Sequence, residues 1–366
     1  MKGLSDMKKN RTMHRLVLGL VSVATLLVVA TGCGNSSSSK KSSSSSTSTT
    51  KVVTDMSGKK VKIPKKVTRV ADLWHANNQV VLLLGGQKKL VATTQMIQQQ
   101  PWFKTVYPGI SKVKAPFAGQ DLQVEALLKT KPQVVISSDP GQIKQARNAK
   151  LPTVNAMYQN FAGLRKSVNL TADVLGGKAP KVAKEYQKTL TNNINYVKSN
   201  LKGVSTKPKV LHIVSTANLD IVDGQNTIVN DWIKDAGGQN ALSQKGNMIT
   251  LTTEQLAKSN PDVIIVGQAT DAAARKALEK NPVLSKLTAV KEGHVYGNPQ
   301  GTFPWDRYSA EEALQVLWAA KKLHPADFKN LNMTTKTKQF YSKYYKYNLS
   351  TTQANQILAG ENPTTK

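Results

Sequence analysis

The sequence has one cysteine and five histidines, and these scarcities exclude several kinds of site. One cysteine among 366 residues excludes an internal disulfide framework and a cysteine-rich zinc site. No two histidines share a short metal-binding spacing such as HxxxH, so we expect neither a metalloprotease nor a histidine cage. The chain also lacks a GxSxG elbow, a P-loop GK(S/T) sequence and a GxGxxG turn. We therefore predict no enzyme and no intrinsic cofactor.

Acidic residues are also scarce, because 22 Asp and Glu face 51 Lys and Arg, for a formal net charge of +29. After residue 32 the chain keeps 46 basic and 21 acidic residues, a net charge of +25. The lysines are scattered and are not clustered with aromatic residues, as a nucleic-acid interface would require. The pattern favours a solvated basic surface suited to anionic lipid and cell-wall polymers, and no nucleic-acid partner.

The N-terminal residues have the pattern of an export signal. Four basic residues between Lys8 and Arg15 precede an uncharged run over 16–30, which is shorter than the roughly 20 apolar residues of a membrane span. Ala30-Thr31-Gly32-Cys33 follows and resembles the lipobox of bacterial lipoproteins. We predict a signal peptide over 1–32 and lipidation of Cys33. The alternative is an ordinary secreted protein with a free thiol.

A serine-rich segment separates Cys33 from the rest of the chain. Ten Ser and three Thr fill thirteen of the seventeen positions over 34–50, so the segment has almost no apolar area to bury. We predict a tether over 33–50 that holds a soluble body at the outer face of the cell membrane. One acyl chain binds a membrane weakly, so stable anchoring requires more than one.

An internal repeat gives the strongest information about the fold. Residues 125–136 (EALLKTKPQVVI) recur as residues 254–265 (EQLAKSNPDVII), and each copy predicts a short helix, a proline-marked break and a buried parallel strand. A helical stretch follows each copy, over 142–149 and over 271–280. We predict an α/β protein with two similarly built lobes, each a mainly parallel sheet flanked by helices.

The residues between the two copies predict a connector. Apolar residues at helical spacing over 161–201, interrupted once at Gly176-Gly177, indicate a long helix that is kinked at that point. A hairpin around 57–59 opens the body. The predicted domains are an N-terminal lobe over 51–160, the connecting helix over 161–203 and a C-terminal lobe with C-terminal helices over 204–366. A stiff helix packed on both lobes should limit their closure to small adjustments.

These features, in this order, resemble the substrate-binding lipoproteins of ABC importers for iron–siderophore complexes, cobalamin and haem. The matching segments are the hairpin ending at Ile63-Pro64, both repeats, the long helix, residues 236–240 (AGGQN) and residues 305–317. The resemblance implies two lobes, one long connecting helix and a shallow cleft. It also implies a monomer whose partners are an ABC permease with its ATPase and a small metal chelate.

The resemblance assigns a docking role to two glutamates by their position in the repeat. In this family each lobe presents an exposed carboxylate to a basic pocket of the permease, and the matching residues are Glu125 and Glu254. The alternative is that each glutamate only stabilises the first turn of its helix through the helix dipole. Both interpretations can hold together.

Residues that follow predicted strands are the candidates for the cleft, because ligands bind at strand ends in open α/β sheets. Trp74 and Trp305 offer flat apolar faces, Arg307 offers charge-assisted hydrogen bonds, and His75 is a donor or a ligand to a chelated metal. Met96 is a haem-iron ligand or a core residue that fills a gap. The full predicted set is Trp74, His75, Gln95, Met96, Tyr158, Asn218, Trp305 and Arg307.

The neighbours of these residues have other expected roles. Asn77 could cap the helix that follows it, and Asp306 could cap a helix or pair with Arg307. His212 lies in an apolar strand and is expected to be a core residue.

The leading prediction of function is capture of an iron–siderophore-type chelate, and the alternatives are haem, cobalamin or a nickel or cobalt chelate. A surface adhesion lipoprotein is the alternative from a different class.

Overall fold

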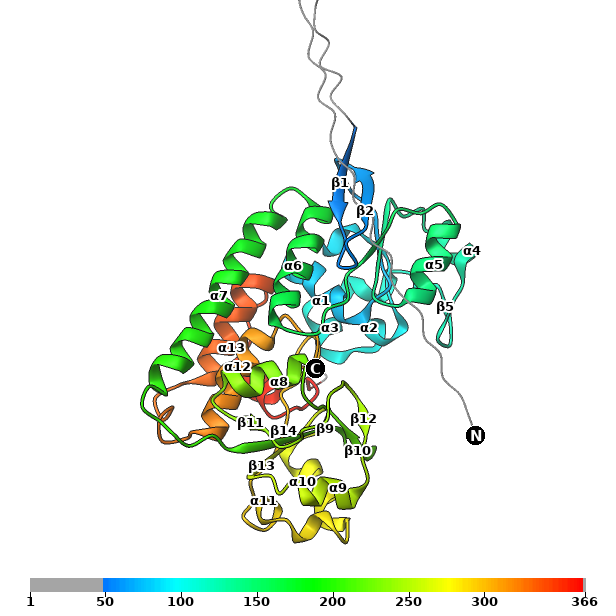
Figure 1. The fold of residues 1–366 in the computed structure, drawn as a ribbon. Helices are drawn as coiled ribbons and strands as arrows, with labels where there is room; N and C mark the ends of the chain where they lie inside the picture. Colours follow the sequence, from blue (N-terminus) through cyan, green and yellow to red (C-terminus); the bar gives the residue numbers. More distant parts are fainter. Residues whose placement is uncertain (1–48, 365–366) are drawn as a thin grey trace, which may run out of the picture. The chain divides into compact units, whose positions relative to one another are not determined.

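The computed structural model describes residues 49–364, which begin with an antiparallel hairpin. Strand β1 (Thr50–Thr54) pairs with β2 (Lys60–Pro64), as the sequence predicted (Figure 1). Asp55 shapes the turn because its Oδ1 accepts hydrogen bonds from the backbone N–H groups of Ser57 and Lys59, both at 2.9 Å. The predicted signal peptide, Cys33 and most of the predicted tether lie outside the described residues.

The N-terminal lobe contains a four-stranded parallel sheet in the order β4-β3-β7-β8. Its strands are short, and most of their residues are β-branched or small and apolar. Both faces of the sheet are buried, as expected for a parallel sheet. Helices α1 and α6 cover one face. The elements are β3 (Val70–Asp72), α1 (His75–Leu83), β4 (Leu90–Ala92), α2 (Gln95–Gln99), α3 (Pro101–Val106), β7 (Val134–Ser137), α5 (Pro140–Asn148) and β8 (Thr153–Asn155).

The C-terminal lobe contains a six-stranded sheet in which β9, β13 and β14 are parallel. Strand β10 returns antiparallel to β9, β12 pairs with β10, and β11 pairs with β9. The sheet is therefore mainly parallel at its centre. The elements are β9 (Lys209–Ser215), β10 (Asn218–Val222), α8 (Ile228–Asp235), β11 (Gln239–Asn240), β12 (Ile249–Thr250), β13 (Val263–Val266), α11 (Thr288–Lys291) and β14 (Val295–Gly297).

The sequence repeat is a structural repeat. The first copy forms α4 (Val124–Lys129) and β7 and leads into α5, and the second forms α9 (Thr253–Lys258) and β13 and leads into α10 (Asp271–Lys280). Residues Lys131 and Asn260 stand directly before the two prolines and both have positive φ, 48° and 42°. The same turn therefore ends the helix in both lobes.

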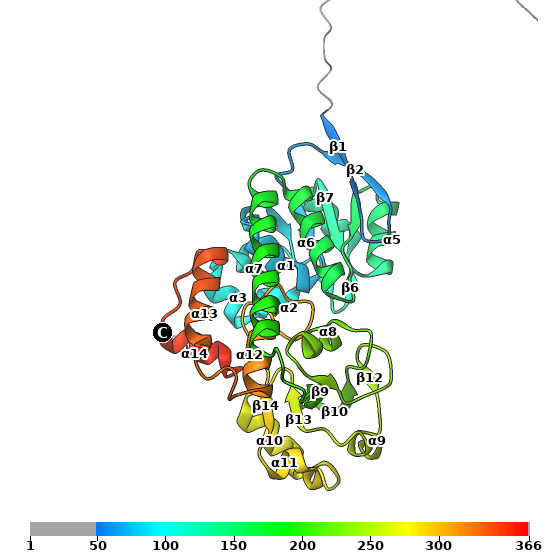
Figure 2. The same ribbon diagram turned by 60° about the vertical axis from the view of Figure 1, so that its left-hand side comes forward.

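The connector consists of two helices separated at the predicted interruption. Helix α6 (Phe161–Leu175) ends at Gly176 and Gly177, whose φ angles of 64° and 61° stop the helix, and α7 (Ala179–Asn200) begins after them. Helix α7 packs against α6 and against α12 (Glu312–Leu323), and in Figure 2 it extends from the N-terminal lobe toward the C-terminal lobe. Tyr186 in α7 donates a hydrogen bond to the carbonyl of Ala310 at 2.9 Å.

The C-terminal helices connect the two lobes. Helix α13 (Met333–Phe340), a π-helical turn (Tyr341–Tyr345) and α14 (Thr351–Leu358) follow α12, and the π turn packs on α1 of the N-terminal lobe. Trp102 of α3 donates its indole N–H to the carbonyl of Glu361 at 2.8 Å. One hydrophobic cluster therefore runs through the helices between the lobes, while the outer face of each sheet has a separate cluster.

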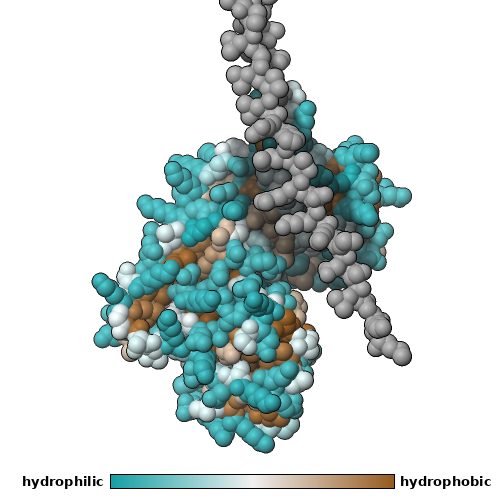
Figure 3. All heavy atoms as spheres, viewed as in Figure 1, coloured by the Kyte–Doolittle hydropathy of each residue, from teal (hydrophilic) through white to brown (hydrophobic). Residues whose placement is uncertain are grey.

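The surface is largely hydrophilic, with apolar residues gathered in limited areas (Figure 3). None of the helices between residues 49 and 364 has the length and apolar character needed to cross a bilayer.

Candidate functional site

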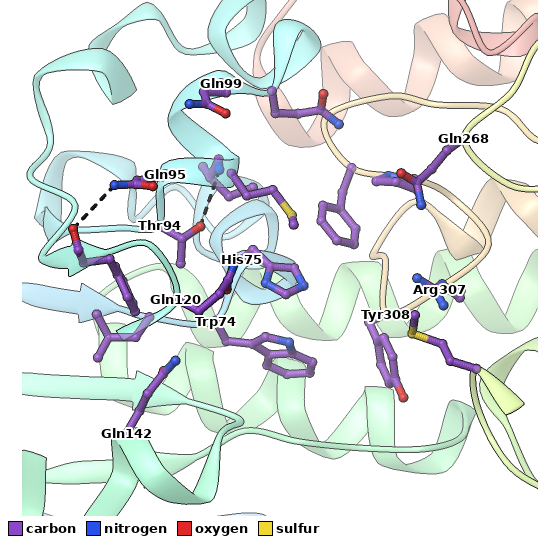
Figure 4. A pocket seen from close by; sticks show the side chains of 18 of the residues that line it. Trp74, His75, Thr94, Gln95, Gln99, Gln120, Gln142, Gln268, Arg307 and Tyr308 are labelled. Atoms are coloured by element: carbon purple, nitrogen blue, oxygen red, sulfur yellow. Dashed lines mark hydrogen bonds between the residues drawn. The ribbon is translucent and has the colours of Figure 1, made fainter. Parts of the chain in front are cut away.

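A cleft of about 710 Å³ lies where the carboxyl ends of the strands in the two sheets face each other. Its walls come from residues that follow β3, β4, β7 and β8 in one lobe and β13 and β14 in the other, with a loop that precedes β12. Figure 4 shows Trp74, His75 and Gln95 on one side facing Gln268, Arg307 and Tyr308 on the other. This is the position where open α/β sheets bind ligands.

Trp74 and His75 reach the cleft because a buried hydrogen-bond network fixes the turn between β3 and α1. The Asp72 carboxylate accepts hydrogen bonds from the Asn77 amide at 2.9 Å and from the backbone N–H of Trp74 at 3.3 Å. Burial raises the pKa of Asp72 well above its usual value. The predicted capping role of Asn77 is wrong, because Asn77 lies inside α1 and Trp74 occupies the N-cap position.

Aromatic rings from both lobes meet at the floor of the cleft. Tyr308 lies edge-on to Trp74, with 5.8 Å between ring centroids, and edge-on to Tyr158 at 5.5 Å. The imidazole of His75 stacks on Phe303 at 5.6 Å with 29° between the ring planes. These geometries are the favoured ones for aromatic pairs, so the rings form a rigid apolar floor across the junction of the lobes.

His75 is a neutral imidazole at physiological pH. Burial, with a smaller contribution from the nearby Arg307 guanidinium, lowers the pKa of His75 to about 4. A neutral imidazole has a lone pair available for a metal ion or a hydrogen-bond donor. Within residues 49–364, no three His, Cys, Asp or Glu side chains gather as a metal-binding group.

Two methionines stand at the mouth of the cleft, one from each lobe. Met96, in α2, has 55% of its surface exposed, and Met248 has 47% exposed. The interpretation of Met96 as a gap-filling core residue is therefore wrong. Thr94 precedes both Gln95 and Met96 and caps α2 through a hydrogen bond from the N–H of Ile97. An exposed thioether is a flexible, polarisable contact for a ligand.

Three residues of the C-terminal wall have left-handed backbone conformations. Met248, Gln268 and Tyr308 line the cleft with φ angles of 53°, 52° and 55°. Residues other than glycine rarely adopt this conformation, and such strain concentrates at functional sites because surrounding contacts must maintain it. The concentration of three such residues in one wall supports a functional role for the cleft.

A buried charge cluster lies behind Arg307. The His212 imidazole bonds Asp223 through Nδ1 and Asp306 through Nε2, both at 2.9 Å. Its pKa is raised to about 9, because these two carboxylates outweigh the effect of burial, which lowers it. The Arg307 guanidinium lies 4.0 Å from Asp223 and keeps 18% of its side chain exposed to the cleft.

The cluster bears on two interpretations made from the sequence. His212 is a core residue, as predicted, but it is charged and bound on both sides. Asp306 neither caps a helix nor pairs with Arg307, because its Oδ2 binds His212 and α12 begins only at residue 312. Asp223 holds a second part of the wall, since its Oδ1 accepts the backbone N–H of Met248 at 2.8 Å.

The structure places five of the eight predicted ligand residues in the lining, namely Trp74, His75, Gln95, Met96 and Arg307. Three do not line the cleft. Trp305 is fully buried in the core between the lobes, and Tyr158 packs edge-on to Trp74 with 5.5 Å between the ring centroids. Asn218 is the first residue of β10, and its side-chain oxygen accepts the backbone N–H of Asp220. Strand-end position alone gave no information about the direction of these side chains.

Several lining residues were missed, and glutamine is the commonest of them. Gln268 lies two residues after the strand that ends at Val266, so the rule that selected Gln95 would have found it. Asn247 and Met248 precede a two-residue strand in an irregular loop and had no sequence signal. The missed lining residues with amide or aromatic side chains are Gln99, Gln100, Phe117, Gln120, Gln142, Asn247, Gln268, Gln300, Phe303 and Tyr308.

Glu125 and Glu254 occupy equivalent positions away from the cleft. Each is an exposed residue in the first turn of its helix, α4 or α9. The expected contribution to helix stability therefore fits both positions. Their exposure also leaves both carboxylates accessible to a partner.

Comparison with known proteins shows a match to the periplasmic binding protein family over residues 70–301. An ABC transporter substrate-binding lipoprotein of Bacillus subtilis, YvrC, is 27% identical over 281 residues, which cover 74% of this chain and 85% of that protein. The haem uptake protein IsdE of Staphylococcus aureus is 28% identical over 196 residues, 50% of this chain and 65% of IsdE.

A solved structure shows the same fold. The molybdate-binding protein MolA of Haemophilus influenzae superposes with a TM-score of 0.73 at 21% identity, over 82% of this chain and 99% of MolA. Relatives with this architecture therefore carry names that refer to different solutes.

Proposed function

The chain belongs to the periplasmic binding protein family, and we propose that it captures an iron–siderophore-type metal chelate and delivers it to an ABC importer. Its relatives are solute-binding proteins of ABC transporters and not enzymes, as the sequence predicted. The general function, solute binding for an ABC transporter, follows from family membership. The chemical nature of the solute is the part that we propose.

The observation that carries the proposal is the composition of the cleft. Its lining combines four aromatic residues, three methionines and a set of neutral amides around one imidazole, in a volume of about 710 Å³. This volume lies within the range for organic ligands, and apolar walls with a few placed polar groups are typical of such sites. A bare metal ion would need a closed set of ligands from both lobes, whereas the lining offers one imidazole and no carboxylate.

Haem is the second candidate for a specific reason. His75 and Met96, two residue types that ligate haem iron, both line the cleft, and IsdE is among the relatives. Haem should then lose affinity when either side chain is shortened to alanine. A siderophore complex, whose iron is already fully coordinated, should lose little with Met96→Ala.

Delivery of the chelate to the permease would depend on a docking surface and on the lipid anchor of the protein. We assign permease docking to Glu125 and Glu254, because they are exposed on equivalent helices of the two lobes, and paired carboxylates far apart on a surface fix orientation against basic pockets. Lipidation of Cys33 and the serine-rich tether would hold a monomer at the outer face of the membrane, beside the permease and its ATPase.

Two measurements test the proposed function. Mass spectrometry of the protein purified from its native host should detect a bound metal chelate. Quenching of tryptophan fluorescence should then rank haem, cobalamin, and ferric and nickel chelates. Trp74 is the tryptophan that lines the cleft, so Trp74→Phe should reduce the quenching, whereas the buried Trp318→Phe should not abolish it. Failure of every chelate to bind would favour the adhesion lipoprotein.

A further inference from the structure

Neutral amide side chains dominate the polar part of the cleft. Of the 23 glutamines in the chain, seven line the cleft, together with Asn247. Five of these glutamine amides make no side-chain hydrogen bond to another residue within 49–364, so they are available to a ligand. They are Gln99, Gln100, Gln120, Gln268 and Gln300. A primary amide both donates and accepts hydrogen bonds without charge, which matches amide, hydroxyl and carbonyl groups on a ligand.

Cationic side chains are almost absent from the same lining. The chain has 51 Lys and Arg, about one residue in seven, yet among the lining residues Arg307 is the one Lys or Arg side chain. The strong basic charge of the protein is therefore excluded from its cleft. An anionic ligand with several charges would be desolvated there without enough cations to compensate it.

The charge of Arg307 is itself balanced from behind. Asp223 lies 4.0 Å from the guanidinium, and His212 bridges Asp223 and Asp306 at 2.9 Å on each side. Two carboxylates, one imidazolium and one guanidinium sum to zero. Burial raises the pKa of the Glu312 carboxyl well above its usual value, which favours the uncharged form of this side chain.

We infer that the cargo is an electrically neutral metal chelate whose surface carries amide, carbonyl or hydroxyl groups, and that multiply charged anionic chelates are excluded. This inference rests on the proposed function. One arginine remains useful to such a cargo, because the Arg307 side chain lines the cleft with 18% of its surface exposed, and its guanidinium can donate to one carbonyl oxygen. The glutamines then contact the rest of the ligand surface.

A panel of four compounds tests the inference with the purified protein. The ferric complex of a cyclic trihydroxamate is neutral, cyanocobalamin is neutral and rich in amides, the ferric complex of a tricatecholate carries three negative charges, and haem carries two carboxylates. Titration calorimetry at constant ionic strength should give at least one neutral compound about 100-fold tighter binding than the tricatecholate complex. Which neutral compound binds distinguishes a hydroxamate cargo from a corrinoid cargo.

The outcomes separate the two proposals. Equal or tighter binding of the tricatecholate complex or haem overturns the inference and leaves chelate capture intact. If none of the four compounds binds and no chelate copurifies, both the inference and the proposed function fail.

Variants of the charge cluster give an independent test. Asp223→Asn leaves one positive charge uncompensated, and should strengthen tricatecholate binding by about tenfold while cyanocobalamin and trihydroxamate affinities change little. The exposed Glu292→Gln, which removes one negative charge far from the lining, is the matched control and should change neither.

Arg307→Gln covers the case in which Asp223→Asn does not fold. A neutral cargo should lose less than about tenfold in affinity, which corresponds to one lost hydrogen bond. A loss above about 100-fold would identify Arg307 as the main anchor of an anionic cargo and would overturn the inference.

Discussion

His75 and Phe303 stack across the junction of the two lobes, with 5.6 Å between their ring centroids. His75 begins α1 of the N-terminal lobe, and Phe303 follows β14 of the C-terminal lobe. A second bridge lies close by, since Tyr308 donates its hydroxyl to the Gln159 side chain at 3.1 Å. The floor of the cleft is therefore formed by contacts between lobes before any ligand binds.

These bridges predict little closure on ligand binding. The connecting helix α7, the π turn packed on α1 and the aromatic floor would all have to rearrange for a large hinge motion. Small-angle X-ray scattering should show a change in radius of gyration below about 1 Å when the cleft is saturated with the chelate that copurifies. A larger compaction would show that the floor opens and closes.

Removal of the charge of His212 should destabilise the protein strongly. His212→Gln leaves Asp223 and Asp306 buried without their bridging cation, which costs about 3–5 kcal/mol of unfolding free energy. Urea denaturation at pH 6 measures this loss. The exposed His294→Gln is the control and should change stability by less than about 0.5 kcal/mol.

The loss should also depend on pH, in a direction set by the raised pKa of His212. The group stabilises the fold fully below its usual pKa of 6.5, and this contribution disappears as the pH rises through about 9. The difference in unfolding free energy between the parent protein and His212→Gln should therefore be smaller at pH 9.5 than at pH 6. A constant difference would mean that His212 is neutral in the fold.

Glu311 predicts a second pH effect over a lower range. Its carboxylate is fully buried and accepts hydrogen bonds from the Thr302 hydroxyl at 3.0 Å and the Phe303 N–H at 3.3 Å. Burial raises its pKa from 4.5 to about 7, so the fold binds a proton that the unfolded chain releases. Stability should fall as the pH rises from about 4.5 to above 7, by up to about 3 kcal/mol.

The variant Glu311→Gln separates this effect from that of His212. It should be more stable than the parent protein at pH 8, and the advantage should vanish near pH 5, where the glutamate is already protonated. Thermal unfolding at the two pH values measures this difference. The exposed Glu292→Gln should show no such crossover, and a Glu311→Gln variant less stable at both pH values would contradict the raised pKa.

The predictable parts of this fold are those whose sequence has a periodic apolar pattern or an internal repeat. The repeats at residues 125 and 254 predicted two lobes, and both form a helix, a positive-φ turn and a buried strand. The glycine pair at 176–177 predicted the interruption between α6 and α7 because glycine adopts positive φ without strain.

Side-chain direction in irregular segments was not predictable in this way. Trp305 and Arg307 are two residues apart in a loop without regular secondary structure, and one faces the core while the other faces the cleft. The pairing of His212 with Asp223 and Asp306 depends on three segments that meet only in the folded protein. No local pattern contains that information, so the charge balance of the cleft had to come from the structure.

The two exposed glutamates provide a test of delivery that is independent of binding. Replacement of both Glu125 and Glu254 by lysine should abolish uptake in cells, because two repulsive contacts would face the basic pockets of the permease. The same variant should bind the copurifying chelate with unchanged affinity, since neither residue lines the cleft. Each single replacement should reduce uptake less than the pair, and Lys129→Glu with Lys258→Glu, on the same two helices, controls for a general change in surface charge. A large loss of affinity in the glutamate double variant would contradict docking, because it would show that these carboxylates act on the ligand site.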